Sequence, residues 1–176
     1  MPLVPVIAVE WLTLFINAFA AEPQAVAGAE AVSADRLIQG EPSVAATVTD
    51  IDRAALATRL WSVFSGSNPT GRAQALSTLL SDVQLAPTID SDGRLQWVTP
   101  LTHKTDLFAA ACIACLTDRV CTVGWNRLGT CDGRDCADVY VDKAGRAPRR
   151  YCSKLCLNRA KVRAYRSRQG AERPPT

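Results

Sequence analysis

Apolar residues recur three and four positions apart in several stretches of the first two thirds of the chain. This spacing gathers them on one face of a helix, so we expect helices over residues 50–64, 71–80 and 105–121. Asp50 is the expected N-cap of the first of these helices. The third has the most continuous apolar face, which predicts that it lies against the core.

Two N-terminal stretches are apolar or alanine-rich without so clear a period. Residues 2–21 predict a buried strand or helix that opens the main domain, and residues 22–43 predict a short helix followed by a loop. The first stretch does not fit a signal peptide, because it lacks a positively charged start and Glu10 interrupts the apolar run. The apolar runs are also too short for a membrane-spanning helix.

Short runs of strand-forming residues predict β-structure at two places. Residues 83–89 and 95–98 flank a turn sequence that ends in Asp-Gly, a strong hairpin signal. Two more short strands are expected over 120–125 and 139–141. Together these patterns predict an α+β protein, with a mainly helical N-terminal domain that includes a small β-hairpin.

Four of the seven cysteines lie near the C-terminal end with the spacing C-x4-C-x15-C-x3-C. Two close pairs joined by a loop supply the four thiolates of a tetrahedral zinc ion. The predicted ligands of one zinc ion are Cys131, Cys136, Cys152 and Cys156. Four thiolates fill the coordination shell, so we expect a structural zinc rather than a catalytic one.

A disulfide framework is the alternative interpretation of these cysteines. Seven cysteines would leave one unpaired, and nothing in the chain indicates secretion, so zinc and a reducing cytoplasm are preferred. The chain has no phosphate-binding loop, nucleophile elbow or paired carboxylates with a catalytic spacing. We therefore do not expect an enzyme.

The net charge of +3 conceals an uneven distribution of charged residues. Residues 1–130 contain 8 basic and 12 acidic side chains, a balance of −4, whereas residues 131–176 contain 12 basic and 5 acidic, a balance of +7. One zinc ion bound by four thiolates lowers the second balance to +5. An acidic body with a basic, zinc-stabilised tail predicts a polyanionic partner, and above all nucleic acid.

The basic tail is predicted to form a helix that starts at the second cysteine pair. Ser153 is a suitable N-cap, so the helix is expected to begin near Lys154 and to run to about Arg168. Cys156 then lies in the first turn, where the helix dipole favours a thiolate. A narrow apolar stripe is expected to dock the helix on the zinc module or on the body; it comprises Leu157, Ala160 and Ala164.

The basic and polar side chains of this tail are the candidate DNA contacts. Lysine and arginine supply phosphate contacts, and Asn158, Arg159 and Arg163 are candidates for base edges. The full set comprises Arg149, Arg150, Lys154, Asn158, Arg159, Lys161, Arg163, Arg166 and Arg168. Simpler roles compete with this interpretation. The first three cations can offset the negative zinc–thiolate cluster, and the last two can serve surface solvation.

The cysteine segment resembles the CGNR zinc-finger family. The family pattern has a cysteine pair, an Asp-containing strand, an Arg-aromatic-Cys-Ser step, and Cys-Gly-Asn-Arg followed by lysine. The matching residues are Cys131 and Cys136, Val139-Tyr140-Val141-Asp142, Arg150-Tyr151-Cys152-Ser153, and Cys156-Leu157-Asn158-Arg159 with Lys161. Leu157 replaces the family glycine, so a side chain must fit where the family has none, and Tyr151 stands where tryptophan is common.

This resemblance implies a bacterial, stress-linked transcription regulator that binds DNA through a treble-clef-like zinc module. Family members usually carry an N-terminal domain called ABATE, and residues 11–18 together with the predicted helices and hairpin resemble a diverged version of it. The implied organisation is an ABATE-like domain over 1–128, the zinc finger with its basic helix over 129–170, and a disordered tail over 171–176.

The other three cysteines, Cys112, Cys115 and Cys121, have three interpretations. With His103, the one histidine of the chain, they would form a second metal site, and alone they would form a redox sensor. Cysteine also behaves as a small hydrophobe, and buried core positions are the preferred interpretation. His103 lies in a polar turn and is expected to be exposed.

These observations favour a cytoplasmic DNA-binding transcription regulator with one structural zinc ion and double-stranded DNA as its partner. The alternative is an adaptor whose zinc module docks on an acidic surface of the transcription machinery. A third interpretation makes the N-terminal domain a small-molecule sensor, since its alanine-rich interior permits a pocket. No membrane association is expected.

Overall fold

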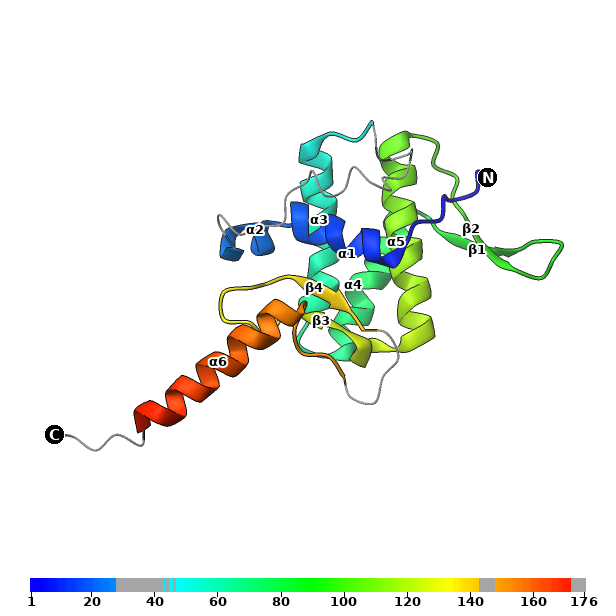
Figure 1. Cartoon of the computed structure of the whole chain (residues 1–176). Helices are drawn as coiled ribbons and strands as arrows, with labels where there is room; N and C mark the ends of the chain where they lie inside the picture. The colour runs from blue at the N-terminus through cyan, green and yellow to red at the C-terminus, as the bar shows by residue number, and fades with distance from the viewer. Residues whose placement is uncertain (28–42, 44, 46, 143–147, 172–176) are drawn as a thin grey trace.

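The computed structural model describes residues 1–27, 43, 45, 47–142 and 148–171. The chain begins with helices α1 (Val9–Phe19), α2 (Ala21–Ala27), α3 (Asp50–Ser65) and α4 (Pro69–Asp82), followed by strands β1 (Ala86–Ile89) and β2 (Leu95–Val98) and helix α5 (Lys104–Val123). A 3-10 turn, η3 (Trp125–Arg127), leads into β3 (Leu128–Thr130), β4 (Val139–Val141) and α6 (Lys154–Ala171). Helix α6 points away from the body that the other helices form (Figure 1).

Helix α1 lies across α3 and α5 and supplies the centre of the core (Figure 1). The ring of Phe15 stacks on Trp11 with centroids 5.4 Å apart, and it meets Phe108 of α5 edge-on at 5.2 Å. Phe15 and Phe108 are fully buried. Removal of these rings from water is a main driving force for assembling the helices. The prediction that residues 2–21 open the domain with a buried element is confirmed.

Short polar residues set the starts of α3 and α4. The Thr49 hydroxyl accepts a hydrogen bond from the backbone N–H of Asp52 (3.2 Å), so Thr49 is the N-cap of α3. The expected N-cap, Asp50, is wrong by one residue; Asp50 lies in the first turn instead, where the helix dipole also favours a carboxylate. Asn68 caps α4, and Pro69 follows at the first helical position.

Strands β1 and β2 form the predicted antiparallel hairpin. In its turn, the Asp90 carboxylate accepts hydrogen bonds from two backbone N–H groups, and Gly93 has a φ of +77°, which glycine adopts without strain. Val83, which was expected to start the first strand, caps the C-terminal end of α4 instead. The strand begins at Ala86, because α4 is longer than its apolar pattern indicates.

The strand expected over 120–125 is wrong. Helix α5 continues through Val123 and ends at Gly124, whose φ of +77° breaks the helix. The β-branched residues of this stretch favour a strand locally. Val120 and Val123 nevertheless pack against the core as part of α5, and this tertiary contact overrides the local preference. The strand expected over 139–141 is confirmed as β4.

The predicted α+β class is confirmed, because the described helices accompany two separate antiparallel hairpins, β1–β2 and β3–β4. The predicted domain limit between residues 128 and 129 falls within β3, and it stays a prediction. The short helix predicted after residue 21 is α2, whereas most of the loop predicted up to residue 43 lies outside the described residues.

The tail helix is longer than predicted, since α6 extends to Ala171. The disordered tail was predicted over 171–176; its first residue therefore belongs to α6, and residues 172–176 lie outside the described residues. None of the described helices is long and apolar enough to cross a membrane.

Candidate metal centre and basic helix

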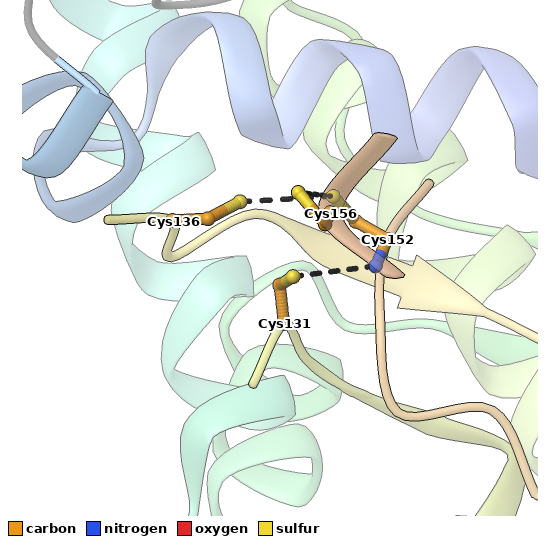
Figure 2. Close-up of side chains that lie close together, drawn as sticks. All are labelled: Cys131, Cys136, Cys152 and Cys156. Carbon is orange, nitrogen blue, oxygen red and sulfur yellow. Dashed lines mark hydrogen bonds between the residues drawn. The ribbon is translucent and has the colours of Figure 1, made fainter. Parts of the chain in front are cut away.

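The four predicted zinc ligands come together from two separate parts of the chain. Cys131 follows β3 and Cys136 precedes β4, while Cys152 precedes α6 and Cys156 lies in its first turn. Figure 2 shows their sulfur atoms turned toward one another. All four sulfur atoms lie within 4.8 Å of one another, with Cys152 Sγ 3.6 Å from Cys136 Sγ and 3.5 Å from Cys156 Sγ.

This arrangement fits a zinc ion. A tetrahedron of sulfur atoms about 2.3 Å from zinc has edges of about 3.8 Å, close to the sulfur–sulfur distances of 3.5 and 3.6 Å found here. All seven cysteines lie in the described residues and none forms a disulfide. The four sulfur atoms therefore have the number, type and spacing of a zinc-binding site, and the chain has a zinc-binding module.

Three of the thiols, Cys131, Cys136 and Cys152, influence one another's pKa. Hydrogen bonds, chiefly from the Cys152 thiol, lower the pKa of Cys131 to about 5. Burial raises the pKa of Cys136 to about 12, and the hydrogen bond to Cys131 raises the pKa of Cys152 well above its usual range. Negative charge on Cys131 thus opposes ionisation of Cys136 and Cys152, and a bound cation would offset this repulsion.

The start of α6 is built as predicted. The Ser153 hydroxyl accepts a hydrogen bond from the backbone N–H of Cys156 (3.2 Å), which is an N-cap interaction. Helix α6 then begins at Lys154. This cap holds Cys156 in the first turn, so the metal centre and the helix start share the same few residues.

Arg149 fastens the segment that leads to α6. It donates hydrogen bonds to the backbone carbonyls of Tyr151 (2.6 Å) and Cys152. Its guanidinium lies over the ring of Tyr140 at 5.7 Å, and the Tyr140 hydroxyl donates to the Arg149 carbonyl. The Tyr140 ring in turn needs Gly129 opposite it, because a Cβ there would lie 2.9 Å from the hydroxyl oxygen. These contacts give Arg149 a role in holding the cysteine loop, whereas its roles as a DNA contact or as an offset for the zinc–thiolate charge stay predictions.

Arg150 also makes a contact inside the module. Its Nε lies 2.8 Å from the Asp132 carboxylate, and its backbone carbonyl accepts a hydrogen bond from Asp132 N–H at 2.9 Å. The Arg150 side chain is 72% exposed, so it also remains accessible to a partner. The contact links the two cysteine pairs across their connecting loop.

Asn17 of α1 joins the module to the body. Its side-chain amide donates to the Val139 carbonyl (3.2 Å) and accepts from the Val139 N–H (2.7 Å), and the whole contact is buried. Trp61 of α3 adds a bond from its indole N–H to the Ala137 carbonyl (2.8 Å). The backbone groups of Val139 and the carbonyl of Ala137 thereby find their hydrogen-bond partners in the body. Sequence reasoning had singled out neither contact, because neither side chain belongs to a local motif.

Arg72 of α4 also joins the module to the body, through η3 and β3. Its guanidinium donates to the carbonyls of Val63 (2.8 Å), Trp125 (3.0 Å) and Leu128 (3.1 Å) and lies 5.0 Å from the centre of the Trp125 ring. Arg72 is 9% exposed, and burial lowers its pKa. The Trp125 ring therefore packs at the junction of the body and the module.

The sequence of this module matches a known family. Residues 127–169 match the family model of the CGNR zinc finger. Over these residues the chain is similar to CGNR zinc fingers, and we call residues 127–169 the zinc finger. The match covers all four clustered cysteines and most of α6, and it confirms the resemblance drawn from the residue pattern. No curated protein matches the chain.

The zinc finger accommodates Leu157 where the CGNR pattern has glycine. Leu157 is half-buried, and its N–H donates to the Ser153 carbonyl at 3.2 Å. Ala160 is also half-buried, whereas Ala164 is exposed. The predicted apolar stripe therefore packs only over the first two turns of α6, and its extension to Ala164 is wrong because α6 has already left the body there.

The polar residues of α6 are all accessible. Lys154, Asn158, Arg159, Lys161, Arg163, Arg166 and Arg168 are exposed. Arg163 lies at the limit of an ion pair with Asp135 (4.0 Å), and Arg168 donates to the carbonyl of Ala164 (3.2 Å). In the described part of the chain, no other helix or strand packs extensively along α6, so these side chains remain available to a partner.

The three cysteines of α5 lie apart from the metal centre. Cys112 is fully buried, and burial raises its pKa; burial also raises the pKa of Cys115 to about 11. Neutral thiols are poor nucleophiles, and within the described residues the four-cysteine cluster is the one group suited to a metal. Cys121 and His103 are exposed, and His103 is the N-cap of α5.

Proposed function

We propose that the protein is a DNA-binding transcription regulator without catalytic activity, acting in the cytoplasm, in which one structural zinc ion orders a basic helix. The observation that carries this proposal is α6 itself. Its 18 residues contain six basic and no acidic side chains. Every residue of α6 from 161 to 169 is exposed, so this part of the helix is open to a partner on all sides.

The metal centre supports this role because it holds the start of α6. Zinc, when bound, neutralises the thiolates and ties the two cysteine pairs together. Ser153, Arg149 and Arg150 fix the backbone on either side of the ligands. A helix held at one end in this way presents its cations at a defined position and loses less entropy when it meets a partner.

The dimensions and charge of α6 suit duplex DNA. Eighteen helical residues span about 27 Å, and the major groove is wide enough to admit a helix. The repulsion among six cations is relieved when phosphates lie alongside. Asn158, Arg159 and Arg163 lie closer to the metal centre than Arg166 and Arg168, so they are the best-positioned candidates for base edges.

Two double variants of equal charge test the proposal. We expect Arg159→Ala with Arg163→Ala to weaken duplex binding by at least about tenfold more than Arg166→Ala with Arg168→Ala, because the second pair lies farther from the anchor and must be ordered on binding. Electrophoretic shift titrations at several salt concentrations measure this. Loss of a phosphate contact lowers the salt slope by about one, whereas loss of a base contact costs about 1–3 kcal/mol of sequence discrimination.

Zinc content and helicity serve as controls, since both variants should retain them. Failure of the intact, zinc-loaded protein to bind any duplex at low salt would refute DNA binding. Equal effects of the two double variants would leave DNA binding in place but remove the privileged role of the residues near the metal centre.

An exposed apolar stripe on α6 favours a second candidate function. Leu155, Val162 and Tyr165 are 59%, 49% and 57% exposed and lie on one side of the helix. Apolar side chains flanked by cations fit an acidic, amphipathic protein surface, as expected of an adaptor that docks on the transcription machinery. Leu155→Gln with Val162→Gln, which preserves the charge, should then abolish protein binding and leave duplex binding unchanged.

A further inference from the structure

A cavity of about 440 Å³ lies between the N-terminal segment, β2 and α5. We call it the α5 cavity. Its apolar wall includes Val4, Ile7, Trp97, Ala111 and Ala114. A volume of this size is within the range of roughly 300–1,000 Å³ found for small-molecule sites.

The walls of the α5 cavity are held in place by backbone hydrogen bonds. The N–H of Val4 donates to the Trp97 carbonyl at 2.8 Å, and the N–H of Thr99 donates to the Pro2 carbonyl at 3.3 Å. Leu3 forms a bridge with Val98, so the N-terminal segment lies beside β2 like a further strand. The cavity is therefore formed by ordered elements and needs no rearrangement to exist.

Arg119 of α5 gives the α5 cavity a polar group without a partner. Its side chain lines the cavity, its Nε is buried, and no residue of the described chain accepts a hydrogen bond from that atom. Arg119 is the one cation among the residues that line the cavity, so its guanidinium is the group that an anionic ligand would meet there. The neighbouring carboxylate, Asp118, is already used: it accepts from the Trp97 indole N–H at 3.0 Å.

We propose that the α5 cavity binds a small amphipathic monocarboxylate, with its carboxylate on Arg119 and its apolar body against Val4, Ile7 and Ala114. A guanidinium pairs with a carboxylate through charge-assisted hydrogen bonds, and the apolar wall removes the rest of the ligand from water. One guanidinium beside one carboxylate, Asp118, matches a single negative charge better than the double charge of a phosphate monoester. Such a site would provide the regulator with an effector, and it does not depend on DNA binding.

Titrations of the ¹⁵N-labelled, zinc-loaded protein with octanoate, 1-octanol and octylammonium test this assignment. The three probes share one apolar chain and differ in head-group charge. We expect saturable shifts of the Trp97 indole and of the Ala111 and Ala114 amides with octanoate, at an affinity about tenfold or more above that of octanol. Octylammonium should bind more weakly than octanol.

Two variants with the same chemical change locate the head group. Arg119→Gln should reduce octanoate affinity about tenfold, to the level of octanol, and leave octanol unaffected. Arg94→Gln is the matched control, because Arg94 lies on the β1–β2 hairpin outside the cavity and is 77% exposed. It should leave all three affinities unchanged. Circular dichroism verifies that both variants are folded.

Three results would overturn the proposal: no saturable shift at the α5 cavity with octanoate, equal affinities for octanoate and octanol, or undiminished octanoate binding by folded Arg119→Gln. If Arg119→Gln does not fold, the comparison of the three probes on the unaltered protein still decides whether the site selects a carboxylate.

Discussion

At the scale of single residues, two buried polar side chains connect the zinc finger to the body. Asn17 satisfies both backbone groups of Val139, and Arg72 donates to three carbonyls at the junction of α3, η3 and β3. Buried polar groups are retained where they pair fully, since an unpaired one costs more than a hydrogen bond returns. These two residues therefore replace apolar packing with directional contacts at the place where the two parts meet.

Arg72→Met tests this view on stability. The substitution preserves much of the side-chain volume but leaves the carbonyls of Val63, Trp125 and Leu128 without their donor. We expect it to lower the free energy of unfolding by about 3 kcal/mol, measured by urea denaturation of the zinc-loaded protein. Arg59→Met is the control: Arg59 pairs with Asp82 at the surface with half of its side chain exposed, so its loss should cost at most about 1 kcal/mol.

The choice of metal ligands is also tested at the residue scale. Purified protein should contain one zinc ion per chain by elemental analysis, and Cys152→Ser should remove it, because three thiolates bind zinc far more weakly than four. Cys112→Ala changes a buried cysteine of α5 and should leave the zinc content unchanged. Two zinc ions per chain, or loss of metal from Cys112→Ala, would refute the single-site assignment.

At the scale of elements, α6 differs from every other described helix in how it is stabilised. Helices α1, α3, α4 and α5 bury apolar faces against one another. Helix α6 has Cys156, Leu157 and Ala160 half-buried near its start, followed by exposed residues from 161 to 169. An isolated helix of this length is marginal in water, and like charges weaken it further. Its order therefore depends on its first turn.

Removal of zinc should consequently melt α6 before the body. We expect a strong chelator to reduce the helical circular dichroism signal by about the contribution of the 18 residues of α6. The near-ultraviolet signal of the buried Trp11 should remain, because Trp11 packs on Phe15 and Phe108. Re-addition of zinc should restore the signal. Retention of the full helical signal in zinc-free protein would show that α6 is stable without the metal centre.

At the scale of the whole molecule, the zinc finger and the body carry net charges of opposite sign and are physically joined. Strand β4 packs on α1 and β3 packs on α3, so the finger starts from a fixed platform. The Arg127–Asp142 ion pair (2.9 Å) lies in this region and is largely shielded from water. A partner that binds α6 therefore acts on the whole molecule rather than on a flexible appendage.

Asn17→Ala tests this connection. It removes both hydrogen bonds to Val139 and leaves a buried N–H and C=O unpaired, so we expect a loss of about 2 kcal/mol in unfolding free energy. Zinc should stay bound, because every ligand lies within residues 131–156. Amide hydrogen exchange should accelerate in β4 and in α1 near residue 17, and exchange in β1–β2 should be unchanged. Loss of zinc would show instead that the finger cannot fold without the body.

The sequence by itself determined the features that depend on neighbouring residues. The spacing of the cysteines, the Ser153 cap and the density of cations on α6 are local, and the zinc-finger family and the α+β class followed from such patterns. The tertiary structure decided what depends on distant residues. Contact with the core made residues 120–123 helical, and Ala164 is exposed because α6 leaves the body. Arg149 contacts the cysteine loop, and Asn17 and Arg72 lie at the junction of the finger and the body. The side chains of Asn17 and Arg72 lie 9 to 122 positions from their partners, and a periodic pattern carries no information about such pairings.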